Sequence, residues 1–284
     1  MSKIGIIADS ACDLYPEEYA ALGVVPLPTL ITFDDETFRD GVDLSAEEFY
    51  RRLVTSPTLP VTAQPSPARL LETFTQCAED GCTEILCLIL SSLLSGTYDT
   101  ACMAAKDSPI PVTVIDTRTV TIAYGQIVAE ASRARDEGME MDALVAHVNA
   151  TIDSSHLLAV MDTLKYLVKG GRGRKTAELA ASMLKIKPVL DLNDEGELVP
   201  IKKCKGRHKA MTEMAKIVKN FTKENGHIYY TLGYTTNPAL AHEFGNMLDN
   251  VEVEGTRLGV HGIGPTVGVY AGPETFGVAF YQRP

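Results

Sequence analysis

The sequence has no apolar run that approaches the ~20 residues needed to cross a bilayer. Its first ten residues lack the layout of a secretory signal, because their apolar stretch is short and ends in Asp9. Positive charge is also scarce. The chain has 26 Lys and Arg against 37 Asp and Glu, and the net charge of −11 repels nucleic acid and anionic membrane surfaces. These absences argue against a membrane-spanning or nucleic-acid-binding protein and predict a cytoplasmic location.

Metal and redox motifs are missing as well. The six cysteines form no C-x-x-C pair, and three of them stand five residues apart, which suits neither a zinc site nor a redox pair. We therefore expect reduced thiols at Cys12, Cys77, Cys82, Cys87, Cys102 and Cys204. The six histidines are scattered without the spacing of metal ligands, so no metal site is predicted.

Familiar catalytic signatures are absent too. The chain has no G-x-x-x-x-G-K-[ST] loop, no G-x-S-x-G elbow and no H-E-x-x-H motif. Gly262-Ile263-Gly264 resembles part of a dinucleotide loop, but Pro265, Thr266 and Val267 follow it and read as a poor helix start. No catalytic residue and no cofactor is predicted.

What the sequence does contain is an alternation of strands and helices. Lys3–Ala8, Ile85–Leu90 and Val112–Ile115 are continuous apolar runs, which predict strands of a parallel sheet buried on both faces. Val24–Phe33 is rich in β-formers but contains two prolines, so it reads as an edge strand. Helices are expected at Pro16–Leu22, Ser45–Leu53 and Pro67–Cys77, from Thr97 to about Lys106, and at Ala123–Glu137.

The second half of the chain has a different pattern. Two short strands flank the turn Asp194-Glu195-Gly196 and predict a hairpin. Further strands are expected at Ile228–Tyr234, Arg257–Val260 and Val278–Tyr281, and helices at Thr163–Lys169, Ala177–Leu184, His208–Lys219 and Pro238–Leu248. The sequence thus predicts an α/β protein with an N-terminal parallel-sheet domain (residues 1–157, helices on both faces) and a C-terminal two-layer α/β domain with a mixed sheet (residues 158–284).

Polar residues follow three of the predicted parallel strands: Asp9-Ser10, Ser91-Ser92 and Asp116-Thr117. Because ligands bind beyond the carboxyl ends of such strands, these residues should face one crevice. The segment Leu90–Thr97 places hydroxyls where a buried strand meets a helix N-terminus, which favours an anion. Ser95 or Thr97 could instead cap that helix. Thr62 lies upstream of the expected cap at Ser66, so capping does not explain it.

Cations are concentrated in two segments of this acidic chain. Five stand between Lys165 and Lys175, with no acid among them, and five more between Lys202 and Lys209. This concentration predicts a docking face or an anion site. A solvated helix flank is an equally good interpretation.

The ordered set of motifs resembles the DegV family of bacterial fatty-acid-binding proteins along essentially the whole chain. The matching segments are Asp9-Ser10-x-x-Asp13-Leu14, Asp40-Gly41-Val42-Asp43, Thr62-Ala63-Gln64-Pro65-Ser66, Ser91-Ser92-x-Leu94-Ser95-Gly96-Thr97-Tyr98, Leu164-Lys165-Tyr166-Leu167-x-Lys169-Gly170-Gly171-Arg172 and Ile186-Lys187-Pro188.

The resemblance implies a long-chain fatty acid lying between the two domains, as a ligand rather than a cofactor. It also implies that the protein is not itself an enzyme but presents the carboxylate to a separate ATP-dependent fatty acid kinase, which makes acyl phosphate for phospholipid synthesis. The implied head-group residues are Thr62, Ala63, Ser92, Ser95, Gly96 and Tyr270. The candidates for facing the kinase are Arg172, Lys205 and Arg207.

Four residues depart from the family pattern, and one of them is Ala123, which replaces a Gly. Ala63 stands where the family usually has Ser, and Lys205 where it often has Arg. Tyr270 occupies the position of a family His, which removes a group able to carry positive charge near neutral pH. A fatty acid otherwise suits such a site, because each buried CH₂ contributes ~0.8 kcal/mol while the carboxylate needs hydrogen-bond donors.

Two other functions remain open on the sequence alone. One is a small-molecule enzyme of phosphotransferase-like fold that acts through Ser92, Ser95 and Tyr270. The other is a regulatory protein that senses lipid. The sequence offers the enzyme no base placed by a motif beside a serine, no nucleotide loop and no metal cluster, which argues against the first of these.

Overall fold

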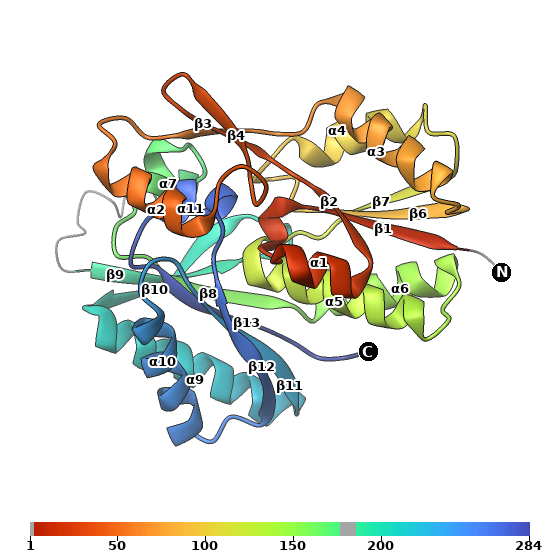
Figure 1. Ribbon diagram of the computed structural model, residues 1–284. Coiled ribbons are helices and arrows are strands. Elements are labelled where there is room, and N and C mark those ends of the chain that lie inside the picture. Colours follow the sequence, from red (N-terminus) through yellow and green to blue (C-terminus); the bar gives the residue numbers. More distant parts are fainter. Residues whose placement is uncertain (1–2, 177–185) are drawn as a thin grey trace.

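The computed structural model describes residues 3–176 and 186–284, so the helix predicted at Ala177–Leu184 lies outside the described residues. Figure 1 shows two main sheets, one in each half of the chain, with a small third sheet above the second. This arrangement confirms the predicted α/β fold with a parallel N-terminal sheet and a mixed C-terminal sheet.

The first sheet is parallel and has four strands in the order β2-β1-β6-β7. These are β1 (Ile4–Asp9), β2 (Val24–Leu27), β6 (Glu84–Ile89) and β7 (Val112–Asp116). Every residue of β1 is buried, as its continuous apolar run predicts. The proline-containing segment Val24–Phe33 forms two strands, and the first of them, β2, lies at the edge of this sheet.

Helices cover both faces of the parallel sheet. Figure 1 shows α3 and α4 on one face, with α1, α5 and α6 on the other. The helices of this half are α1 (Pro16–Leu22), α2 (Ala46–Thr55), α3 (Pro67–Glu79), α4 (Thr97–Ala105), α5 (Thr121–Asp136) and α6 (Met141–Asp153), with a 3₁₀ turn η1 (Ser10–Cys12) after β1.

The second sheet has six strands in the order β10-β9-β8-β13-β11-β12. Their bounds are β8 (His156–Val160), β9 (Ile186–Leu192), β10 (Leu198–Lys205), β11 (Ile228–Tyr234), β12 (Gly255–Gly262) and β13 (Phe276–Tyr281). β9 and β10 form the predicted hairpin, and only the β11–β12 pair is parallel. Helices α9 (Arg207–Asn225) and α10 (Pro238–Asn250) pack on the sheet, while β11 and β13 also contact α5 of the first half.

A third, antiparallel sheet was not predicted. It has the order β4-β3-β5, with β3 (Leu30–Phe33), β4 (Glu36–Arg39) and β5 (Val61–Ala63). Its core side chains pack against α2, α7 (Lys165–Lys169) and α11 (Pro265–Ala271). A further 3₁₀ turn, η2 (Arg174–Thr176), follows α7. β3 lies inside the segment Val24–Phe33 that was predicted as a strand, whereas β4 and β5 escape sequence reasoning because three or four residues are too few to show a period.

One local prediction was wrong. The residues after Gly262-Ile263-Gly264 read as a poor helix start, yet α11 begins at Pro265 with Gly264 as its N-cap. Proline is favoured at the first position of a helix, because its fixed φ suits the helix and its missing N–H would have no intrahelical partner there. The segment is therefore a helix start, seven residues long.

The second sheet begins shortly after α6 ends at Asp153, since β8 starts at His156. The predicted domain boundary at 157/158 falls inside β8. The division into domains of residues 1–157 and 158–284 stays a prediction.

Hydrogen bonds tie the two halves of the chain together at several places, among them the start of α11 and the β9–β10 hairpin. At the first, the Asp40 carboxylate accepts from both the N–H and the hydroxyl of Thr266, while the Tyr50 hydroxyl donates to the Ile263 carbonyl at 3.0 Å. At the second, the Ser91 hydroxyl donates to the Gly196 carbonyl at 2.8 Å, in the turn of the β9–β10 hairpin.

Three carboxyl groups are buried at the carboxyl end of the parallel sheet and beside α11. Asp9, Asp13 and Asp40 are 0%, 6% and 4% exposed. None of them forms an ion pair with Lys or Arg within the described residues. Burial raises the pKa of Asp9 and of Asp40 to about 6, and it raises the pKa of Asp13 as well. Hydrogen bonds to each carboxylate oppose these increases only in part.

These carboxyl groups predict that the protein is less stable at pH 8 than at pH 5. The folded state holds protons up to about pH 6 that the unfolded chain releases near pH 4, so the free energy of unfolding falls as pH rises through this window. We expect urea denaturation to show this decrease, and Asp40→Asn to reduce it by about 1 kcal/mol, since one pKa unit corresponds to about 1.4 kcal/mol.

Asp136→Asn is the matched control, because Asp136 is exposed at the end of α5. Its pH dependence should equal that of the wild type. If Asp40→Asn and the wild type lost the same free energy of unfolding between pH 5 and pH 8, the assignment to Asp40 would be wrong.

Candidate functional site

A cavity of about 360 Å³ lies between the two main sheets. One wall is formed where the parallel strands end, by residues that follow β1, β6 and β7. The opposite wall is the face of the six-stranded sheet, with contributions from β8, β10 and β13. Segments of β5, α11 and the loop after α7 complete the enclosure. The cavity thus occupies the position at which parallel α/β sheets bind ligands. The polar residues expected to face it do not line it; they are Asp9, Ser10, Ser91, Ser92, Asp116 and Thr117.

Most of the wall is apolar. Leu90, Val120, Leu157, Met161 and Phe276 reach it from both sheets. Its volume lies within the range of about 300–1,000 Å³ that is usual for pockets holding small molecules. An apolar wall of this extent suits an alkyl chain better than a polar substrate.

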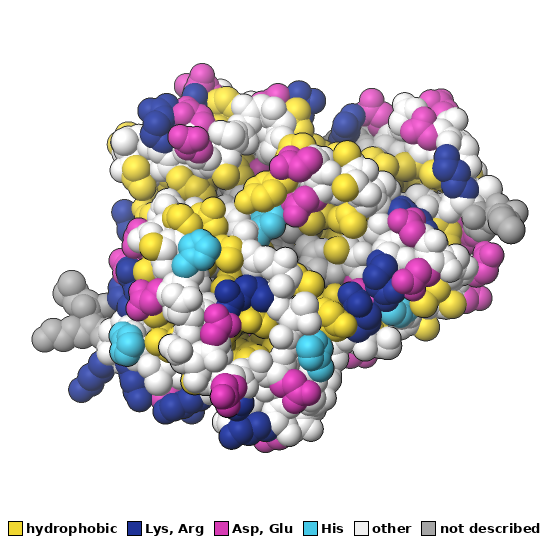
Figure 2. Space-filling view, turned by 60° about the horizontal axis from the view of Figure 1, so that its bottom comes forward, with side chains coloured by type: hydrophobic (Ala, Val, Ile, Leu, Met, Phe, Trp, Pro, Cys, Tyr) yellow, Lys and Arg dark blue, Asp and Glu magenta, His cyan; other side chains and the backbone are white. Residues whose placement is uncertain are grey.

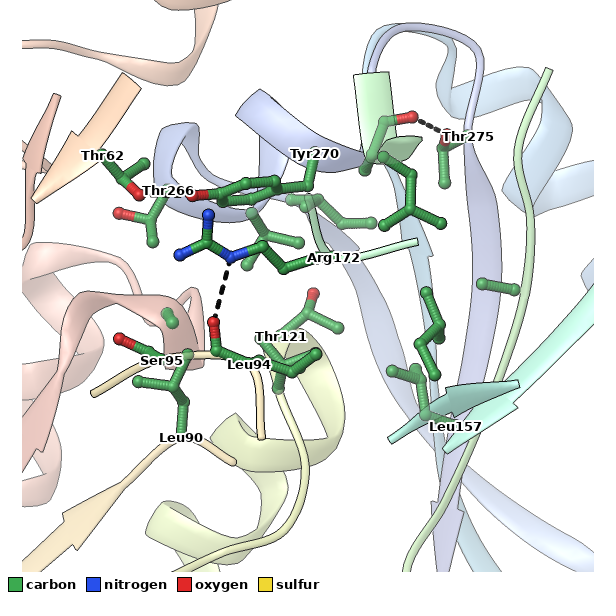
Figure 3. A pocket seen from close by; sticks show the side chains of 18 of the residues that line it. Thr62, Leu90, Leu94, Ser95, Thr121, Leu157, Arg172, Thr266, Tyr270 and Thr275 are labelled. Atoms are coloured by element: carbon green, nitrogen blue, oxygen red, sulfur yellow. Dashed lines mark hydrogen bonds between the residues drawn. The ribbon is translucent and has the colours of Figure 1, made fainter. Parts of the chain in front are cut away.

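Polar groups gather at one end of the cavity, below β5 and α11. The hydroxyls of Thr62 and Tyr270 form a hydrogen bond of 2.6 Å. Arg172 lies beside them, with its guanidinium carbon 4.8 Å from the centre of the Tyr270 ring. Figure 3 shows the Arg172 side chain extended between Tyr270 and Leu94.

Arg172 is held in place by backbone carbonyls. Its Nε donates to the Leu94 carbonyl at 3.1 Å and its Nη1 to the Gly170 carbonyl at 2.8 Å. Within residues 3–176 and 186–284, no carboxylate forms an ion pair with it. A fixed positive charge therefore lines an otherwise neutral cavity wall, and its Nη2 is available for a hydrogen bond to an anion.

Gly170 explains how the arginine and the tyrosine come so close. A Cβ on Gly170 would lie 2.5 Å from the Tyr270 ring, so only glycine lets the end of α7 pack against this ring. Arg172 follows two residues later. The packing of α7 on α11 therefore places Arg172 in the cavity wall, and the sequence carries no local signal for this contact between two helices.

Ser95 and Ala63 also line the cavity, as two of the predicted head-group residues. The Ser95 hydroxyl bonds to that of Thr97 at 2.8 Å. Gly96 is not part of the wall. It gives room to Gln64, whose Oε1 would lie 2.7 Å from a Cβ on Gly96 and whose Nε2 donates to Thr100. Gln64 itself lines the cavity and was not predicted to do so.

Ser92 lies outside the cavity wall. Its backbone N–H points to the Asp116 carboxylate, with both oxygens at 3.3 Å. The structure therefore brings together Thr62, Ala63, Ser95 and Tyr270, while the predicted contact between Ser92 and a head group stays a prediction.

The three residues predicted to face a partner lie in different surroundings. Arg172 is in the cavity wall. Arg207 pairs with Asp162 at 3.1 Å and with Glu274 at 3.4 Å. Lys205 is exposed on the edge strand β10, together with Lys202 and Lys203. Lys and Arg side chains gather at the lower left of Figure 2.

Metal-binding clusters and membrane-spanning helices are both missing from the described residues. These residues contain no group of three His, Cys, Asp or Glu side chains that could hold a metal ion. In the same part of the chain, no helix is both long and apolar enough to span a bilayer. All six cysteines are free thiols, as predicted.

Comparison with known proteins identifies relatives along the whole chain. A family model described as an uncharacterised protein of the DegV family matches residues 3–283. A DegV domain-containing protein of Caldanaerobacter subterraneus is 32% identical over 285 residues, with complete coverage of both chains. Another, from Deinococcus radiodurans, is 32% identical over 281 residues and covers 98% of each chain.

Solved structures share the fold and are described by their ligands. A fatty-acid-binding DegV family protein of Streptococcus agalactiae is 26% identical, with a TM-score of 0.92 and full coverage of both chains. A DegV family protein of Thermus thermophilus, described by its fatty acid binding, is 25% identical, with a TM-score of 0.92 and 99% of each chain covered. A stearic-acid-binding protein of Eubacterium ventriosum is 26% identical, with a TM-score of 0.91, and covers 100% of this chain and 99% of its own.

Proposed function

The chain belongs to the DegV family, and we propose that it binds a long-chain fatty acid in the cavity between its two sheets. The observation that carries this proposal is the fixed charge of Arg172 beside the Thr62–Tyr270 hydroxyl pair, at the polar end of a largely apolar cavity. The fatty acid binding described for relatives of the same fold supports it.

The proposed head-group contacts follow from which donors are free. Thr62 and Tyr270 share one hydrogen bond, so one of their two O–H groups remains free to donate to a carboxylate. Arg172 uses Nε and Nη1 for carbonyls and keeps Nη2 for the anion. Ser95 supplies a further hydroxyl from the loop before α4. Together these groups meet the hydrogen-bond requirement of a buried carboxylate, whose charge Arg172 compensates.

The alkyl chain would extend away from this end along the apolar wall. Val120 lines this wall from the first half of the chain. Leu157, Leu198 and Phe276 line it from the six-stranded sheet. Each buried CH₂ contributes ~0.8 kcal/mol, so a tail of about sixteen carbons supplies on the order of 10 kcal/mol before the cost of ordering it.

The proposal predicts that the purified protein carries a fatty acid and that Arg172 sets its affinity. Extraction followed by mass spectrometry should release a long-chain fatty acid. Arg172→Met should weaken fatty acid binding by about 10- to 100-fold, because a hydrogen bond to a charged group contributes about 1.5–3 kcal/mol. Titration with a fluorescent fatty acid measures this change.

Arg172→Lys is the matched variant, since it keeps the charge but loses the guanidinium fork. It should bind more tightly than Arg172→Met and less tightly than the wild type. Equal affinities for wild type and Arg172→Met would remove Arg172 from the head-group site.

The residue at position 270 should determine how affinity depends on pH. With Tyr270 beside the permanent charge of Arg172, we expect nearly constant affinity between pH 6 and pH 8. Tyr270→His introduces a group that is protonated at pH 6 and neutral at pH 8, so this variant should bind severalfold more tightly at pH 6. Tyr270→Phe, which lacks a titrating ring, serves as control. Equal pH slopes for the wild type and Tyr270→His would contradict this prediction.

The proposal extends to a partner. The protein would present the bound carboxylate to a separate ATP-dependent fatty acid kinase in the cytoplasm, and the acyl phosphate would feed phospholipid synthesis. Catalysis would reside in the kinase: the hydroxyl of Ser95 bonds to Thr97 rather than to a base. Lys202, Lys203 and Lys205 support a docking role, because they are exposed and none has an acidic partner within the described residues.

Charge reversal separates docking from lipid binding. In a reconstituted assay with a fatty acid kinase and ATP, the triple variant Lys202→Glu, Lys203→Glu, Lys205→Glu should reduce acyl phosphate formation about tenfold or more, because like charges then oppose docking. Its fatty acid affinity should be unchanged.

A triple reversal at Lys216, Lys219 and Lys223 on α9 is the control for net charge and should leave acyl phosphate formation unaffected. A similar loss in both triple variants would show a general charge effect and no docking face on β10.

A further inference from the structure

The cavity between the two sheets opens to solvent beside its polar end. Among the described residues that line it, only Ala63 and Gln64 are exposed. Both directly follow Thr62, whose hydroxyl bonds to that of Tyr270. Figure 3 shows Thr62 on the left of the cavity and the buried Leu157 on the right. A carboxylate held at the polar end therefore faces the opening, and its alkyl chain lies deeper.

Three large apolar side chains near this opening are exposed to solvent. Val61 is 62% exposed, Leu93 is 56% exposed and Met103 is 61% exposed. Val61 lies on β5, two residues before Ala63. Because side chains alternate along a strand, Val61 and Ala63 point to the same side of β5, opposite to Thr62. Val61 is therefore beside the opening.

Met103 lies on the face of α4 that is turned toward the opening. Gln64 reaches this helix, where its Nε2 donates to the Thr100 hydroxyl and its Oε1 lies against Gly96. Met103 follows Thr100 by three residues and Gly96 by seven, so all three share one face of α4. Met103 thus extends the surface that Gln64 touches.

Leu93 lies next to the arginine of the polar end. It precedes Leu94, which lines the cavity and whose carbonyl accepts the hydrogen bond from Arg172 Nε. We refer to Val61, Leu93 and Met103 as the apolar collar. Single exposed apolar side chains are common on proteins, whereas a group of them beside the opening of a ligand cavity indicates an interaction surface.

The orientation of the ligand decides whether the apolar collar suits a lipid bilayer or a protein. A fatty acid in a bilayer has its carboxylate at the surface, so the carboxylate would leave the membrane first and enter the opening first. The cavity requires the reverse order, because its polar groups lie beside the opening and its apolar wall lies deeper. The net charge of −11 also repels anionic membranes. The collar therefore suits a protein that acts on the carboxylate.

We propose that the apolar collar is the surface on which the fatty acid kinase closes over the bound carboxylate, an inference that rests on the proposed function. Covering the three side chains removes apolar surface from water and so favours the complex. It also keeps water away from the reacting groups. In the reaction, a carboxylate oxygen forms a bond to the γ-phosphorus of ATP, and the bond from this phosphorus to the bridging oxygen breaks and releases ADP.

The test is a reconstituted assay with a fatty acid kinase, ATP and the fatty-acid-loaded full-length protein. The collar variant Val61→Thr, Leu93→Gln, Met103→Gln makes the surface polar at nearly constant size. It should raise the Michaelis constant for the loaded protein at least about tenfold, because the loss of one buried apolar side chain already weakens an interface by about that factor. Its fatty acid affinity should be unchanged, since none of the three residues lines the cavity.

The matched control is the triple variant Val42→Thr, Val54→Thr, Leu258→Gln. These side chains are 54%, 57% and 49% exposed and do not line the cavity. The control should leave the Michaelis constant unchanged. An unchanged Michaelis constant for the collar variant would overturn the inference while fatty acid binding stood. An equal rise in both triple variants would overturn it too, since the effect would then not be specific to the opening.

Two further measurements separate the collar from other roles. A loss of fatty acid affinity in the collar variant would assign the three side chains to the ligand site and would contradict a partner surface. In sedimentation with phosphatidylcholine vesicles, the wild type should stay in the supernatant. Vesicle binding that the collar variant loses would make the collar a membrane contact and would also overturn the inference. A wild type that bound no fatty acid would contradict the proposed function, and this inference with it.

Discussion

The hydrogen bonds between Asp40 and the first turn of α11 are the interaction on which the cavity between the two sheets, the proposed lipid site, depends. α11 has seven residues, too few to be stable as an isolated helix. The Asp40 carboxylate binds both the N–H and the hydroxyl of Thr266, where the helix dipole favours a negative charge. Tyr270 stands one turn later on the same helix and reaches Thr62 on β5. A carboxylate from the first half of the chain thus fixes the polar end of a cavity that both halves enclose.

The burial of carboxyl groups beside the cavity lowers the stability of the fold. Asp9, Asp13 and Asp40 are buried without ion pairs to Lys or Arg in the described residues, and burial disfavours their charged forms. Asp9 has a structural role. Its two carboxylate oxygens accept from the N–H groups of Ala11 and Leu90 and so join the ends of β1 and β6. The carboxyl ends of two neighbouring strands are then held in register at the cavity wall. The buried carboxylates thus hold the strand ends in place at the cavity wall, and their burial lowers the free energy of unfolding, as is common at binding sites.

The sequence predicted the features that follow from local patterns, and it failed for those that depend on contacts between distant segments of the chain. Continuous apolar runs predicted β1, β6 and β7 because a strand buried on both faces has no polar side. The short strands β4 and β5 carry no such signal, and α11 was missed because Pro265, Thr266 and Val267 read as a poor helix start. Thr62 and Ser95 were expected near one another from the resemblance to the family. Arg172 was expected at the surface, because its place beside Tyr270 is set by how α7 packs on α11, which no local pattern encodes.

The substitution at position 270 has a physical consequence that Arg172 makes intelligible. A histidine there can supply positive charge only when protonated, whereas Tyr270 supplies a hydroxyl that bonds to Thr62. The guanidinium of Arg172 is permanently charged and lies against the face of the Tyr270 ring, where a cation is stabilised by the ring's electrons. The Tyr270 ring therefore helps to fix the position of Arg172, while its hydroxyl forms the hydrogen bond with Thr62. In this chain the fixed charge of Arg172 and the hydroxyls of Thr62 and Tyr270 stand in place of a titratable histidine. The affinity of this end of the cavity for an anion is therefore set by the positions of these groups and not by pH.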